Sequence, residues 1–322
     1  TIQDSSAAKS GTITGGNAKD GGGVYIEAYA TLEMTGGCIT GCRAEDGGGV
    51  YIDNNATLKM TGGCITDCHA SYGGGIYSYE NLYMGGTAKI EKCTSNGGSY
   101  DAIWNRERCN IYADGGTVDG TVSNLGTIMH SEGAAAETVF NGTVYNRSAG
   151  KIEAGIYKGT VENTGTITGG TFYDAVTNRK ASLSFMTEAG TISGGTFYGS
   201  IVNEGGPEQV ADSAKVAVTF NTDGGTSVAE EKVLRGQKMS KPAAPTKSGY
   251  TFTGWEDANG AYDFNTPVIA PLTLTARWEE VPSSGGNYYY HPTTDTKADD
   301  AKGSPKTADP GVALYAALSL LS

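Results

Sequence analysis

Proline is scarce in this chain of 322 residues, with only 9, and the Leu-, Glu- and Lys-rich runs that build helices are nearly absent. Glycine, in contrast, occurs 49 times and tyrosine 19 times. A chain rich in glycine, threonine, tyrosine and valine is typical of short strands joined by tight turns. The composition therefore predicts an all-β protein, and the length is sufficient for two domains.

An excess of basic residues is also missing, because the formal net charge is −12. A nucleic-acid groove needs a basic surface, so we expect no nucleic-acid partner. The chain begins at Thr1 and shows no signal peptide. We therefore expect it to be a piece of a longer gene product.

Motifs that carry chemistry are lacking as well. The sequence has no Gly-x-Ser-x-Gly elbow, no His-Glu-x-x-His pair and no phosphate-binding glycine loop. Its histidines, His69, His130 and His291, are scattered. Carboxylates recur at Asp20 and Asp46, but Tyr72 follows in the next repeat, so no cluster of three forms for calcium. We expect no catalytic residue, no metal and no cofactor.

What the sequence does contain is a repeat. The phrase "DGGGVYI" occupies residues 20–26 and again 46–52, and "GGGIYS" follows at 73–78. Self-similarity at a fixed step is typical of a solenoid. Each repeat holds three short runs of alternating residues, so the pattern predicts a right-handed parallel β-helix with three short strands per turn.

Alternation also predicts which side chains face inward. Val50, Ile52, Leu58 and Met60 would lie on one face of their strands, and Tyr51 on the other. In stacked turns Val24, Val50 and Ile76 would form an inner column. We expect the glycines to mark a corner that needs positive φ or a close approach of two backbones.

Looser copies continue the solenoid. "GTITGGTFYDAVTN" at 165–178 recurs as "GTISGGTFYGSIVN" at 190–203. We therefore assign residues 1–206 to the β-helix and residues 207–215 to a linker.

The six cysteines divide into two kinds. Cys42, Cys68 and Cys93 each stand three residues after an isoleucine, which favours a small buried filler over a zinc ligand. Cys38 and Cys64 would point outward from adjacent turns, at a distance that a disulfide can span. We therefore hypothesise a disulfide between Cys38 and Cys64.

Tyr25, Tyr51 and Tyr77 would form an outward column. Such a strip of rings could contact a ligand by stacking on sugars or docking a partner. The alternative, which we favour, is that the tyrosines stack on one another and stiffen the sheet.

Residues 216–280 predict a second, compact β module with Phe252, Trp255 and Trp278 among its core residues. A characteristic set of residues runs through the segment: Val218, Thr219, Phe220, Gly224, Gly225, Pro242, Pro245, Gly249, Tyr250, Thr251, Phe252, Gly254, Trp255, Leu272, Thr273, Leu274, Ala276, Arg277 and Trp278. In these residues and their order the segment closely resembles the internalin B-type repeat, also called the Listeria–Bacteroides repeat. The resemblance implies a small β-grasp-like domain of bacterial surface proteins, acting as spacer or adhesive unit.

Residues 281–303 are polar and of low complexity, which predicts a disordered linker. Residues 304–322 resemble a truncated cell-wall sorting signal, in which sortase joins the threonine of Leu-Pro-x-Thr-Gly to peptidoglycan. Thr307 would then be the attachment residue. Ser304 and Ala308 depart from the family's Leu and Gly, and the apolar run from Val312 is too short to span a bilayer. The motif residues are Ser304, Pro305, Lys306, Thr307 and Ala308.

Two functions remain open at this stage. The first is a non-enzymatic protein on the surface or cell wall of a Gram-positive-like bacterium, serving as adhesin or display stalk for glycans or for host and matrix proteins. The second is a fragment of a polysaccharide-degrading β-helix enzyme whose catalytic turns lie outside this chain. An enzyme needs several carboxylates with Arg or Lys on one outer sheet, and the repeat columns here change identity too often, which favours the first.

Overall fold

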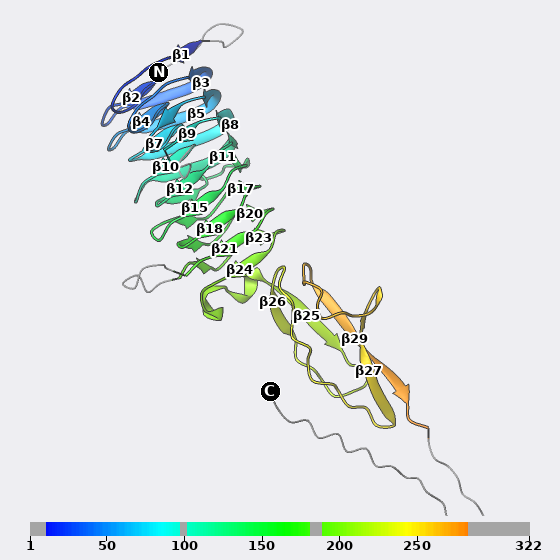
Figure 1. Cartoon of the computed structure of the whole chain (residues 1–322). Helices are drawn as coiled ribbons and strands as arrows, with labels where there is room; N and C mark the ends of the chain where they lie inside the picture. The colour runs from blue at the N-terminus through cyan, green and yellow to red at the C-terminus, as the bar shows by residue number, and fades with distance from the viewer. Residues whose placement is uncertain (1–10, 97–101, 181–188, 283–322) are drawn as a thin grey trace, which may run out of the picture. The chain divides into compact units, whose positions relative to one another are not determined.

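The computed structural model describes residues 11–96, 102–180 and 189–282. Across these ranges the regular elements are strands and two short 3-10 helices (Figure 1). The described residues up to Val281 form one compact unit. Thr307 and the rest of the predicted sorting signal, 304–322, lie outside the described residues, as does nearly all of the predicted linker 281–303.

The first part of the unit is a parallel β-helix, as the sequence predicts. In every turn a short strand pairs in parallel with its counterparts in the turns before and after it, so that Val24 lies beside Val50 and Val50 beside Ile76. The described short strands form one nine-stranded sheet. Its members are β2 (Val24–Ile26), β4 (Val50–Ile52), β7 (Ile76–Ser78), β10 (Ile103–Asn105), β12 (Val122–Asn124), β15 (Val144–Asn146), β18 (Val161–Asn163), β21 (Val176–Asn178) and β24 (Ile201–Asn203).

The other faces of the coil are built from longer strands in the early turns. These strands are β1 (Thr12–Thr14), β3 (Thr31–Thr40), β5 (Thr57–Thr66), β8 (Asn81–Glu91) and β11 (Asn110–Val118). The pairing of β3 with β5 shifts register near the Gly36–Gly37 pair, and Gly37 has a φ of +74°. A glycine there lets one strand bend and serve two faces, because only glycine adopts this conformation at low cost.

After β11 the long strand divides into two. One series is β13 (Thr127–Met129), β16 (Lys151–Ile152), β19 (Thr166–Ile167) and β22 (Thr191–Ile192), and the other is β14 (Val139–Phe140), β17 (Ile156–Tyr157), β20 (Thr171–Phe172) and β23 (Thr196–Phe197). Both series join the same 13-stranded parallel sheet. A further corner carries the short pair β6 (His69–Ala70) and β9 (Thr94–Ser95).

The interior is filled by columns of like side chains. Val50, Ile76 and Leu58 are fully buried, and each lies beside an aliphatic neighbour in the next turn. A buried aliphatic side chain contributes about 1.5–3 kcal/mol, so a few such columns are enough to stabilise a coil without helices.

The glycine triplet of each early turn has two physical causes. Gly47 has a φ of +65°, a conformation that L side chains rarely adopt. A Cβ on Gly48 would lie 2.5 Å from the carbonyl oxygens of both Gly74 and His69, and a Cβ on Gly49 would lie 2.4 Å from the Ile65 side chain. The triplet is therefore required by one strained corner followed by two close approaches between turns.

A ladder of asparagines runs through the later turns, and the repeat alignment did not reveal it. Each side-chain amide donates to the carbonyl oxygen of the next, at 2.7–2.9 Å. Buried amides need such partners, because an unpaired polar group in the interior is costly. The recurring signal is an aliphatic residue, any residue and an asparagine at the end of the short strand. The ladder residues are Asn105, Asn124, Asn146, Asn163, Asn178 and Asn203.

A stack of aromatic rings fills another corner of the same turns. Phe140, Tyr157, Phe172 and Phe197 follow one another with ring centroids 4.8–5.0 Å apart. The buried Tyr157 hydroxyl donates to the Ala154 carbonyl at 2.7 Å, so its polar end is paired. The spacing of parallel strands, about 4.8 Å, is also a comfortable distance for stacked rings.

Two 3-10 helices follow the last strand of the coil. They are η1 (Pro207–Gln209) and η2 (Asp212–Ala214), and Val210 forms a parallel bridge with Ile192 between them. Val210 and Ala214 are buried in the β-helix core. Their apolar side chains thus cover part of the end of the coil.

Residues 215–280 form a separate five-stranded sheet with strand order β26-β25-β29-β27-β28. β25 (Lys215–Asn221) and β29 (Leu272–Glu280) pair in parallel at its centre, and β26 (Glu231–Leu234), β27 (Tyr250–Asp257) and β28 (Gly260–Ala261) are antiparallel to their neighbours. Trp255 is buried in the core, and the Trp278 indole donates to the Thr222 carbonyl at 3.1 Å. Both tryptophans are thus held by the fold of the module.

A glycine pair tests the close approach between turns. We expect Gly48→Ala to lower the free energy of unfolding by about 1–3 kcal/mol, because the new methyl group overlaps two carbonyl oxygens. Gly85→Ala is the matched control, since a Cβ there meets nothing closer than 3.7 Å and its stability should change by less than about 0.5 kcal/mol. Urea denaturation followed by far-UV circular dichroism measures both, and equal losses would contradict the steric explanation.

A second pair of variants tests the asparagine ladder. Asn146→Ala removes an amide that donates to Asn163 and accepts from Asn124, so we expect a loss of about 2–4 kcal/mol. Asn110→Ala, which removes a half-buried bond to Asn81, should cost less than about 1 kcal/mol. Thermal denaturation ranks the two, and a reversed order would mean that the ladder adds no stability.

Candidate functional site

The predicted tyrosine column exists on the outer face of the short-strand sheet. The rings of Tyr25 and Tyr51 stack with centroids 5.0 Å apart, and those of Tyr51 and Tyr77 with centroids 5.4 Å apart and an angle of 1°. The stack continues to Trp104, whose ring lies 5.9 Å from that of Tyr77. Trp104 occupies the same register position one turn on, which the sequence analysis missed because that turn lacks the "VYI" phrase.

Exposure changes along this column. Tyr25 is 45% exposed, whereas Tyr77 is only 7% exposed. The Tyr25 hydroxyl donates to the Asp53 carboxylate at 2.6 Å, and this bond is the main reason why the pKa of Tyr25 is raised to about 12. Burial raises the pKa of Tyr77. Tyr77 thus serves mainly as a support for its neighbours.

A groove of about 670 Å³ lies over the end of the column. Tyr77 and Trp104 line it, together with Tyr72, Tyr79 and Arg106. These residues come from neighbouring turns of the coil, since the strand that carries Trp104 pairs directly with the strand that carries Tyr77. We refer to this feature as the Trp104 groove.

Ring contacts fix the aromatic side chains of the Trp104 groove. The rings of Tyr72 and Trp104 meet edge to face, 4.7 Å apart at 88°. Tyr79 leans against Tyr77 at 5.3 Å, and the Arg106 guanidinium lies 4.2 Å above the Tyr79 ring. Cation–π contact holds that guanidinium over the ring.

Asp46 is the notable polar residue in the groove. Its Oδ1 atom is buried and makes no hydrogen bond with the described residues. Burial raises the pKa of Asp46, and the nearby Asp20 and Glu45 raise it further, while Lys19 and Arg106 oppose the shift. An unpaired carboxylate oxygen beside a positioned guanidinium provides hydrogen-bond acceptors and donors together.

The lining determines which chemistry is available in the groove. Its described lining residues include tyrosines, a tryptophan, arginines and carboxylates, and no serine, threonine, cysteine or histidine is among them. Such a lining can hold a ligand by ring contacts and hydrogen bonds.

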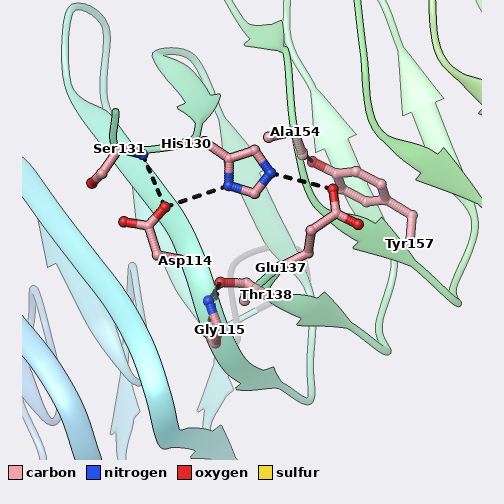
Figure 2. A network of polar contacts seen from close by, with 8 residues as sticks. All are labelled: Asp114, Gly115, His130, Ser131, Glu137, Thr138, Ala154 and Tyr157. Carbon is pink, nitrogen blue, oxygen red and sulfur yellow. Dashed lines mark hydrogen bonds and ion pairs between the residues drawn. The ribbon is translucent and has the colours of Figure 1, made fainter. Parts of the chain in front are cut away.

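A polar network on another face involves His130 (Figure 2). Its Nδ1 lies 3.4 Å from Asp114 and its Nε2 lies 3.3 Å from Glu137, so carboxylates flank both ring nitrogens. The Ser131 backbone amide donates to Asp114 at 2.9 Å, and the Thr138 hydroxyl donates to the Gly115 carbonyl. The network therefore joins β11 to the segment between β13 and β14, and its hydroxyl is already paired with the backbone.

The structure joins Cys38 and Cys64 by a disulfide between β3 and β5, with Cα atoms 4.6 Å apart. Cys42, Cys68 and Cys93 are buried in the core and free, as is Cys109. Burial raises the pKa of the Cys42 thiol and raises that of Cys109 to about 12. Both should stay protonated and unreactive in the folded protein.

The described residues contain no group of three or more His, Cys, Asp or Glu side chains placed to hold a metal ion. Within the same ranges, no helix has the length and apolar character needed to cross a membrane.

Comparison with known families gives one match. Residues 217–277 match the Listeria-Bacteroides repeat domain. This confirms the resemblance drawn from Val218, Trp255, Arg277 and their neighbours, and it assigns the five-stranded module to that repeat.

Several curated proteins are similar to short stretches of the chain. Two come from Evansella cellulosilytica: one named as a Gly-rich membrane protein, 36% identical over 66 residues, and one named as a membrane protein, 38% identical over 78 residues. Internalin H of Listeria monocytogenes is 34% identical over 91 residues. These stretches cover 19%, 23% and 27% of this chain and 8%, 11% and 16% of the relatives. The chain thus spans only a small part of the length of the curated relatives it matches.

Thiol counting tests the cysteine arrangement. The unreduced protein, unfolded in denaturant, should show four thiols, and six after reduction, because one disulfide is present among six cysteines. In the Cys38→Ser variant the unreduced count should rise to five, since Cys64 is released. Six thiols before reduction would contradict the disulfide, and Cys42→Ser, which should give three, is the control.

Proposed function

We propose that this chain is part of a non-enzymatic bacterial surface protein, in which the β-helix presents a binding face and the repeat module acts as a spacer. The observation that carries the proposal is the Listeria-Bacteroides repeat at residues 217–277, on the same chain as the β-helix. Two similar proteins are named as membrane proteins and a third as an internalin, which supports a location at the cell surface.

The β-helix is suited to display. Its turns contact only their neighbours, so the coil can be extended turn by turn without changing its cross-section. The disulfide between Cys38 and Cys64 fits an oxidising, extracellular environment. The adhesive role would fall to outward residues, with glycans or host and matrix proteins as partners.

The proposed anchor is the cell wall of a Gram-positive-like bacterium. Sortase would cleave after Thr307 and join it to peptidoglycan, as the similarity of residues 304–308 to a sorting motif suggests. The support is the sequence alone, since these residues lie outside the described part of the chain.

Surface labelling tests the proposal. Antibodies against the repeat module should label intact cells of the source organism, and protease added outside should remove the signal, because the module would face the medium. In cells that express Thr307→Ala the protein should move from the wall fraction to the culture medium or the membrane. Thr294→Ala, in the same tail, is the matched control and should stay in the wall.

Labelling only after permeabilisation would contradict surface display. Retention of Thr307→Ala in the wall would remove the sortase step and leave the display role intact. A separate assay tests the enzymatic alternative. If the purified chain releases unsaturated sugars from polyuronate, the chain is an enzyme.

A further inference from the structure

We propose that the Trp104 groove binds neutral hexopyranose rings of a glycan. The proposal rests on the display role above and names the ligand class of that binding face. Its basis is the combination of aromatic rings, two guanidinium groups and one unpaired carboxylate oxygen around a single groove.

The size of the Trp104 groove is that of a small-molecule site. The groove has a volume of about 670 Å³, within the range of roughly 300–1,000 Å³ usual for small-molecule sites. It opens on the outer face of a rigid parallel sheet, so its walls are set before any ligand arrives. A preformed site loses less free energy to ordering on binding than a flexible one.

The aromatic side chains supply an apolar contact. Trp104 is supported by Tyr77 beneath it and by the edge of Tyr72 beside it, while Tyr72 itself is 43% exposed. A hexopyranose has one face covered mainly by C–H groups and a rim of hydroxyls. Its C–H face can pack against such rings, because they offer large apolar area at low entropic cost.

Polar groups beside the rings match the hydroxyl rim. The buried Oδ1 of Asp46 marks a carboxylate whose hydrogen-bonding capacity is not filled by the described residues. Arg106, held over the Tyr79 ring, has five N–H donors in a fixed plane. A sugar hydroxyl donates and accepts at once, so neighbouring hydroxyls can pair with an acid and a guanidinium together.

The charge of the lining argues against a polyanionic glycan. Its acidic residues, Asp46, Glu80 and Glu107, outnumber the basic Arg106 and Arg108, and the chain carries a net charge of −12. A polyanionic glycan would therefore be repelled. Among glycans, a neutral polar ring remains.

A second exposed tyrosine pair provides the matched control. Tyr173 and Tyr198 stack at 4.9 Å and are 53% and 55% exposed, so they resemble an aromatic platform as closely as Tyr72 does. They do not line the Trp104 groove. A Tyr173→Ala/Tyr198→Ala variant therefore loses two outward rings and leaves the groove unchanged.

The test is glycan binding by the full chain. An array of neutral oligosaccharides, polyuronates and sulfated glycans is probed first, and isothermal titration follows with the neutral oligosaccharide that gives the strongest signal. We expect neutral glycans to bind. Trp104→Ala and Asp46→Asn should each weaken binding at least tenfold, and the tyrosine double variant should bind as the unaltered chain does.

Tyr72→Ala guards against a folding defect in Trp104→Ala, because Tyr72 is exposed and its removal should weaken binding while the circular dichroism spectrum stays unchanged. Three results would each overturn the proposal: absence of any neutral-glycan binding, a preference for polyuronate, or binding by Trp104→Ala and Tyr72→Ala that is as strong as binding by the unaltered chain. The surface-labelling result is independent of all three, so a failure of the groove remains distinguishable from a failure of surface display.

Discussion

The in-register pairing of parallel strands is the constraint on which everything else in the β-helix depends. It places each residue of the short-strand sheet directly beside its counterpart one turn away, at about 4.8 Å. That single distance suits three kinds of column: aliphatic chains in contact, amides that hydrogen-bond at 2.7–2.9 Å, and rings stacked at 4.8–5.4 Å. An asparagine in the interior is stabilised where the next turn supplies a partner, which is why the asparagines occur as a continuous ladder.

Register is kept along the short-strand sheet, while turn length is not. Cys38 and Cys64, in adjacent turns, are 26 residues apart, whereas Asn163 and Asn178, also in adjacent turns, are 15 apart. The difference is absorbed at the corners, where the long strands divide into two short ones and glycines allow tight bends. Because each turn contacts only its neighbours, such changes alter the outline of one turn and leave the inner columns in place.

These two facts explain what the sequence could and could not predict. The fixed 26-residue step of the early turns made the columns of Val24, Tyr25 and Cys38 readable, and a strict alternation gave their faces. The ladder from Asn105 onward and the position of Trp104 were missed, because the step changes from turn to turn and an alignment at constant period loses them. The sequence also could not predict how exposed each tyrosine is. Tyr25 and Tyr77 share a column, yet Arg106 and Tyr79, which lie outside that column, leave Tyr77 nearly covered.

The Trp104 groove forms where the repetition breaks. Three tyrosines in succession, Tyr25, Tyr51 and Tyr77, form a stacked row of like rings. At the fourth position the ring becomes Trp104, and Ser123 takes its place in the turn that follows, so the row ends. Around that end stand residues that the early repeats do not share, Arg106 and Tyr79 among them. Columns of like side chains stabilise the solenoid, so a site with its own set of side chains forms where neighbouring turns differ. The residues that depart from the repeat are therefore the positions at which binding can be selective.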